Sequence, residues 1–193
     1  MADEKLGNSG LALHEDRFPG IYRGKVLDNN DPRQLGRIKI QVYPMFTDIV
    51  DPVLLPWAVP AYSIWEGSGV GIGYFAVPDV DTFVFVFFEQ GDVYQPVYFA
   101  EAPTAGMGLP TDRTVNYPNR KVIKTSSGIT IIVDDTAKHV RVNHPTGTYV
   151  LIDTTGKVQV VAVDNIDLTS AKDINITATG NVIIKGNTVQ INP

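Results

Sequence analysis

Residues 150–191 read VLIDTTGKVQVVAVDNIDLTSAKDINITATGNVIIKGNTVQI and repeat every eight residues. Each unit holds two apolar residues separated by one other residue, and a polar or turn-forming stretch follows them. The pairs are Val150/Ile152, Val158/Val160, Ile166/Leu168, Ile174/Ile176 and Val182/Ile184, and a sixth, Val189/Ile191, arrives one residue early. Because side chains alternate between the faces of a strand, each unit predicts one short strand with two inward residues and a tight turn.

Strands of this kind cannot bury themselves within one chain. Two inward residues per strand do not enclose a core, and a chain that folds back every eight residues forms a thin ribbon. Three copies wound around one axis would form a triangular prism, in which strands pair with strands of the other chains and sheet edges disappear except at the ends. We therefore predict an intertwined trimeric β-helix over residues 150–193, with the twelve paired residues as its core. An ordinary antiparallel sheet is the alternative.

Upstream, the composition changes near residue 120. Of 18 aromatic residues, 17 lie in residues 1–120, as do 11 of the 13 prolines. Helical periodicity is almost absent and period-two alternation recurs, which predicts an all-β chain. In the first part the alternation predicts strands at Gly20–Leu27, Gly36–Tyr43, Ile72–Phe75, Thr82–Phe88 and Pro96–Phe99. Five strands at these spacings suit a small closed barrel of the oligonucleotide/oligosaccharide-binding (OB) fold.

The predicted organisation has five parts. Residues 1–17 form an N-terminal arm, 18–101 the OB-fold barrel, 102–120 a linker, 121–149 a strand-rich transition segment and 150–193 the shaft. The chain has no cysteine, which excludes disulfides and thiolate metal sites. Its net charge of −5 argues against dedicated nucleic-acid binding. The start MADEKLGNSG lacks the pattern of a signal peptide, and no apolar run is long enough to span a membrane, so we expect a soluble chain made in the cytosol.

Residues that could suggest catalysis or metal binding have simpler interpretations. His139 and His144 are five residues apart, so on one strand they face opposite sides and cannot chelate together. Asp134 and Asp135 are adjacent, which favours a turn over a pair of acid/base carboxylates. The glycines in GSGVGIG (Gly67, Gly69, Gly71 and Gly73) match no phosphate-binding motif, and we interpret them as a flexible loop. We predict no catalytic residues, no metal and no cofactor.

Aromatic residues of the first part have two interpretations each. Phe83, Phe85 and Phe87 share one face of a strand and could stack nucleic-acid bases. Because Val84, Val86 and Phe88 make the other face apolar, a strand buried on both faces is the favoured interpretation. Trp57 and Trp65 flank PWAVPAYSIW and could anchor an interface or fill the core.

Two parts of the chain resemble a known family. YRGKVLDNNDPRQLGRIKIQVYP, LPWAVPAY and VPDVDTFVFVFFEQGDVYQPVYFA resemble the N-terminal barrel of the central spike proteins of contractile phage tails and of the valine-glycine repeat proteins of type VI secretion. TSSGITIIVDDTAKHVRVNHPTGTYVLIDTTGKVQV resembles the segment that leads into their trimeric β-helix. The connection EAPTAGMGLPTDRTVNYPNR is too short for the lysozyme domain that some members carry there.

The resemblance implies a structural, non-enzymatic homotrimeric spike of a virion tail baseplate, assembled in the host cytoplasm. It implies a baseplate hub protein as the partner of the barrel, and a target outer membrane that the spike punctures. The chain lacks the family's H-x-H iron motif. We therefore expect Gln190, Ile191, Asn192 and Pro193 to bind a separate tip protein of the proline-alanine-alanine-arginine repeat type, and no nucleic acid to be bound.

Two other classes of function remain as alternatives. A β-helical protein that binds or hydrolyses cell-wall glycan would need clustered carboxylates or exposed aromatics, yet residues 150–193 contain no aromatic residue and no Glu. An OB-fold module that binds nucleic acid would need basic surface, whereas residues 1–120 carry 9 basic and 15 acidic residues.

Overall fold

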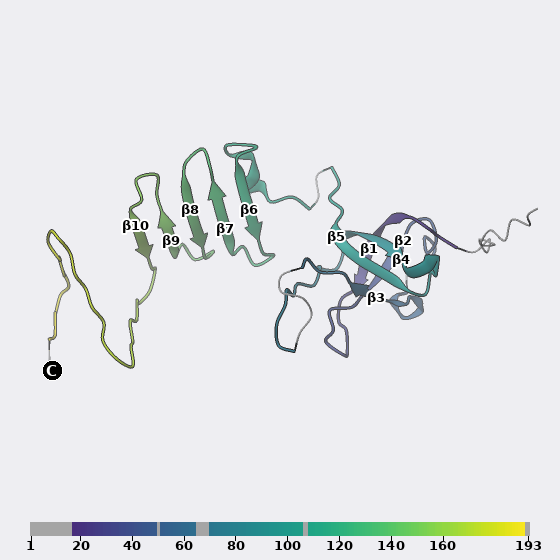
Figure 1. The fold of residues 1–193 in the computed structure, drawn as a ribbon, viewed down its shortest axis with the longest axis horizontal. Coiled ribbons are helices and arrows are strands. Elements are labelled where there is room, and N and C mark those ends of the chain that lie inside the picture. Colours follow the sequence, from purple (N-terminus) through teal and green to yellow (C-terminus); the bar gives the residue numbers. More distant parts are fainter. Residues whose placement is uncertain (1–16, 50, 65–69, 106–107, 192–193) are drawn as a thin grey trace, which may run out of the picture. The chain divides into compact units, whose positions relative to one another are not determined.

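A computed structural model describes residues 17–49, 51–64, 70–105 and 108–191 (Figure 1). The chain divides into two compact units, Met1–Leu109 and Pro110–Pro193, which are described separately. Both units are built from strands, and three short 3₁₀ turns (Pro52–Leu54, Glu89–Gly91 and Thr111–Thr114) lie between strands of the described residues. In the described part of the chain, no helix is long and apolar enough to cross a bilayer.

The first unit is a closed five-stranded barrel. Its strands are β1 (Ile21–Asp28), β2 (Ile38–Val42), β3 (Trp57–Pro60), β4 (Phe83–Phe88) and β5 (Pro96–Glu101), in the order β1-β2-β3-β5-β4. β3 pairs with β5 in parallel, and the other neighbours are antiparallel. The predicted five-stranded barrel is therefore confirmed.

One predicted strand is wrong. Residues 72–75 lie in a connection without strand pairing, and the third strand of the barrel is β3 instead. Gly71 and Gly73 adopt φ values of +75° and +135°, which break an extended backbone. The sequence does not predict β3, because Pro56 precedes it and Pro60 ends it, and proline argues against a strand. The strand is only four residues long, so Pro60 is its last residue and interrupts little of the ladder.

The barrel core follows the alternation along its strands. Val26, Ile40, Val42, Val84 and Val86 point inward and are almost fully buried. The rest of the core cluster comprises Ile38, Ala58, Phe88 and Tyr98. On β4 the outward residues Phe83, Phe85 and Phe87 are partly buried, so a single chain covers the outer face of this strand less completely than the predicted burial on both faces.

The β1–β2 connection is organised by one carboxylate. Asp31 Oδ1 accepts from the backbone N–H of Arg33 (3.0 Å) and from Arg37 Nη2 (2.6 Å). Asp31 Oδ2 accepts from the backbone N–H of Leu35 (2.9 Å), and from Arg37 Nε (3.0 Å) and backbone N–H (3.4 Å). Gly36 follows with φ +74°, and a Cβ there would lie 2.3 Å from Tyr62 Oη, so the close approach requires glycine. The loop DPRQLGR is thus held in shape by hydrogen bonds between its own residues.

The second unit is an antiparallel meander of five strands. They are β6 (Arg120–Lys124), β7 (Thr130–Asp134), β8 (His139–Asn143), β9 (Tyr149–Ile152) and β10 (Val158–Val161), each paired with the next (Figure 1). Residues 162–191 carry no helix or strand in the single chain, and nearly all of them are exposed. The predicted trimeric β-helix is therefore not present in one chain, which forms a flat sheet over its first two repeat units.

Candidate functional site: an apolar face on the second sheet

One face of the β6–β10 sheet is covered by aliphatic side chains. Two cross-strand rows run over it, as the strand register shows. The first row is Ile123, Ile131, Val142, Val150 and Val160, and the second is Val133, Val140, Ile152 and Val158. All nine of these side chains are at least 40% exposed. We call these nine residues the apolar face.

The opposite face of the same sheet mixes aliphatic residues, such as the buried Ile132, with polar residues that bond to one another. Arg120 Nε donates to Asp134 Oδ2 at 2.7 Å, and both side chains are largely buried. The Arg141 guanidinium lies 4.1 Å from the centroid of the Tyr149 ring, and its Nε donates to Asn143 Oδ1. The opposite face thus has its polar groups bonded within the chain, whereas the bare apolar face needs a partner.

A charged pair borders the apolar face at β6. Lys121 lies opposite Val133, at the end of the second row, and its Nζ bonds the carboxylate of Asp135. Asp134 points to the other face, so the two adjacent carboxylates face apart, as the sequence predicts. They cannot cooperate as an acid/base pair.

Asp134 makes the second unit sensitive to acid. The backbone N–H of Ala137, the Arg120 guanidinium and the Asn116 amide hold the pKa of this carboxyl well below its usual range. A pKa lowered by folding stabilises the protein above the unfolded value of about 4, and the contribution is lost as pH falls toward the folded value. We expect Asp134→Asn to lower the melting temperature at pH 7, and the difference from wild type to shrink below about pH 4. Thermal melts across that range measure it, and a difference independent of pH would contradict it.

The predicted core residues divide at residue 161. Val150, Ile152, Val158 and Val160 lie on β9 and β10 and share the apolar face. The later core residues are exposed in a segment without strands: Ile166, Leu168, Ile174, Ile176, Val182, Ile184, Val189 and Ile191. Gln190 and Ile191 of the expected tip-binding segment are exposed as well, whereas Asn192 and Pro193 lie outside the described residues.

Sequence reasoning missed the upstream part of the apolar face. Ile131/Val133 and Val140/Val142 are pairs of the same kind as those of the repeat. They precede Val150/Ile152 at intervals of nine and ten residues, so a search for a period of eight passes over them. The cross-strand register places them in the same two rows.

Other residues weighed for chemistry have structural positions. His139 is half-buried on β8, and His144 Nδ1 lies 2.8 Å from Thr146 Oγ1 in the β8–β9 turn. Among the residues that the structure describes, no cluster of His, Asp or Glu could hold a metal ion. Trp57 lies on β3 beneath the cations of Arg37 and Lys39, at 5.3 Å and 5.0 Å. Trp65, Gly67 and Gly69 lie outside the described residues.

Comparison with known proteins identifies the barrel. A search of curated proteins finds no match to the chain. A family model described as the type VI secretion system/phage-baseplate injector OB domain matches residues 22–101, which run from the second residue of β1 to the last residue of β5. Over these residues the barrel is therefore similar to the OB domain of type VI secretion and phage-baseplate injectors.

Proposed function

We propose that this protein is the homotrimeric central spike of a contractile-tail baseplate. Its barrel docks on the hub at the end of the tail tube, and its repeat region forms the shaft that punctures the target envelope. The injector OB domain at residues 22–101 supports the baseplate role. The bare apolar face of the second sheet, continued in sequence by the repeat, is the single observation that carries the proposal.

The dimensions of the apolar face favour three chains over two. Each strand from β7 to β10 contributes two outward apolar residues and β6 contributes one, so the apolar stripe is only about 7 Å wide at roughly 3.3 Å per residue. Two such walls would pack about 10 Å apart and leave both sides of the core open to water. Three walls close a triangle and cover every apolar side chain. In that arrangement residues 162–191 find in the other chains the hydrogen-bonding neighbours that one chain does not provide.

The mechanism that follows is mechanical. A shaft whose strands are bonded around an axis, with interlocked aliphatic residues inside, resists bending and unfolding under load. We propose that this shaft carries a tip protein at residues 190–193 and transmits the force of tail contraction. No step requires a bond to be made or broken, so the proposed role is structural.

Light scattering on the full chain tests the oligomeric state. The expected mass after size exclusion is about 63 kDa, three times that of the 21.1 kDa chain. The trimer should also resist SDS or mild heating, because the chains are wound together rather than side by side. A mass of one or two chains would reject the proposed spike.

A further inference from the structure

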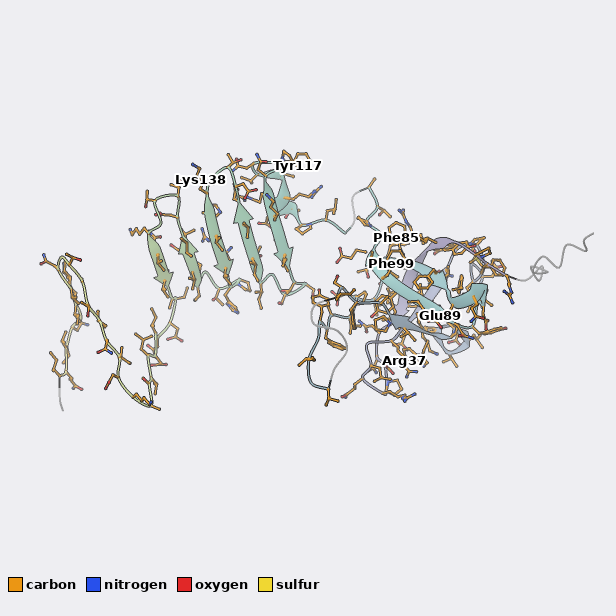
Figure 2. The ribbon with its side chains drawn as sticks, in the orientation of Figure 1. Arg37, Phe85, Glu89, Phe99, Tyr117 and Lys138 are labelled. Carbon is orange, nitrogen blue, oxygen red and sulfur yellow. The ribbon has the colours of Figure 1, made fainter. Side chains whose placement is uncertain are left out.

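The outside of the barrel carries an apolar surface of its own. A row of four apolar residues crosses four strands, each residue opposite the next: Val59 on β3, Val97 on β5, Phe87 on β4 and Ile21 on β1. Next to this row, Phe99 stacks on Phe85 at 6.1 Å and contacts the Phe87 ring at the same distance (Figure 2). Ile21 and Val59 remain more than half exposed. We call Ile21, Val59, Phe85, Phe87 and Phe99 the barrel patch.

The outer side of β2 is built differently. Lys39 and Gln41 point outward there and are buried, because the β2–β3 connection folds over them. Gln41 Nε2 donates to the carbonyls of Thr47 (2.8 Å) and Ile49 (3.1 Å), and Lys39 Nζ donates to that of Val53 (3.3 Å). The barrel thus covers its polar side with its own chain, whereas the described residues leave Ile21, Val59 and Phe99 of the barrel patch at least 40% exposed.

A second apolar surface lies on the β3–β4 connection. Tyr62, Tyr74 and Phe75 pack edge to face at 5.8 to 5.9 Å and hold the base of the connection against Gly36. Val70 is fully exposed, and Ile72 is 53% exposed beyond that base. We call residues 70–75 the apolar loop. Its aromatic residues are packed against Tyr62, and its aliphatic residues Val70 and Ile72 are exposed.

Symmetry decides how two such surfaces can be used in a trimer. Copies of one patch can meet on the threefold axis itself, as in the shaft core. Away from that axis, a patch that pairs with its own copy makes a twofold contact, which cannot close a ring of three. A threefold ring needs two different complementary surfaces on each chain. We propose that the apolar loop of one barrel packs on the barrel patch of the next, so that three barrels close a ring. This inference rests on the trimer proposed above.

Charge and tethering support this pairing. Arg23 lies over the Phe85 ring at 5.5 Å and has no carboxylate partner among the described residues. The charged residues that follow the apolar loop, Asp79 and Asp81, are both acidic, and Asp81 pairs with Lys25 of its own chain. Asp79 of one barrel can therefore meet Arg23 of the next. Barrels held together by a shared shaft meet at an effective concentration on the order of millimolar, so a small contact suffices to close the ring.

Because the chain has no cysteine, the thiols introduced by mutation are the only sites at which a thiol-specific crosslinker reacts. The double variant Val59→Cys/Ile72→Cys carries one thiol on the barrel patch and one on the apolar loop. With a short bismaleimide we expect covalently closed trimers on denaturing gels. Each single variant can give dimers at most, because it has one thiol per chain. The matched control is Leu54→Cys/Ile72→Cys, since Leu54 is exposed on the 3₁₀ turn between β2 and β3 and is not part of the barrel patch, and it should give no covalent trimers.

The outcomes separate this inference from the proposed function. Light scattering on the double variant comes first, and a mass below three chains rejects the spike together with the ring. A trimer that yields covalent trimers no better than the Leu54 control rejects the ring alone. If the Val59→Cys thiol reacts freely with maleimide in the trimer and becomes protected only on adding the hub, the barrel patch belongs to the hub and the ring is wrong.

Discussion

The Val142→Asp variant is expected to lose the trimer and to run as a single chain. Val142 lies in the middle of the first row of the apolar face, between Ile131 and Val150. Three copies of the new carboxylate would meet around the axis without a cation, and each unpaired buried charge costs several kcal/mol. Light scattering and the loss of the SDS-resistant band measure the effect.

A matched control lies one residue further along the strand. Asn143→Asp adds the same charge to the opposite face, where Asn143 Oδ1 already accepts from Arg141 Nε, so a carboxylate fits the position. This control should remain trimeric. Trimers of normal heat resistance from Val142→Asp would show that the apolar face is not the trimer core.

A second variant tests how far along the chain the trimer core extends. Ile176 lies in the repeat beyond β10, where the single chain has no strand. If residues 162–191 wind into the shaft, Ile176→Asp should abolish trimers as Val142→Asp does, while Thr177→Asp should leave them intact. Loss of the trimer in the Val142 variant alone would limit the shared core to the β6–β10 sheet.

Alternation predicted most of the barrel, and its failures have physical causes. Strands such as β2 were visible because Ile38, Ile40 and Val42 alternate with polar residues, and an inward row of that kind needs a core. β3 was missed because its neighbours on β2 and β5, rather than its own residues, select it: Ala58 pairs with Ile38, and Val59 with Val97. A pattern within one segment contains no information on the strand that will lie beside it.

At the candidate site, a clear sequence pattern did not predict the structure of a single chain. The period of eight after residue 149 was evident from sequence, yet in one chain only the first two units form strands. Upstream, the turns between β7, β8 and β9 vary in length, which hides Ile131 and Val142 from a search by period although the ladder aligns them. Register is set by hydrogen bonding between strands, and turn length can vary without changing it.

Removing the carboxylate of Asp31 is expected to destabilise the barrel more than any other single loop change. Asp31→Ala would leave the Arg37 guanidinium and three backbone N–H groups without their acceptor. The same guanidinium lies over the Trp57 ring, so its release also loosens the contact to β3. We expect the melting temperature of the barrel to fall by roughly 10 °C. Tryptophan fluorescence should follow the transition, because Trp57 contacts Arg37 directly.

Asp51→Ala is the matched control for this variant. Asp51 is an exposed loop aspartate that accepts one backbone hydrogen bond through its side chain, from Val53 at 2.9 Å, so its loss should shift the melting temperature by only a few degrees.

Asp31→Asn tests the role of charge separately. Arg37, more than any other group, holds the pKa of Asp31 far below its usual range, so the carboxylate stays ionised through mild acid. An amide keeps one acceptor oxygen and loses the ion pair, and it should melt between wild type and Asp31→Ala. Equal melting of the two alanine variants would show that DPRQLGR closes without its carboxylate.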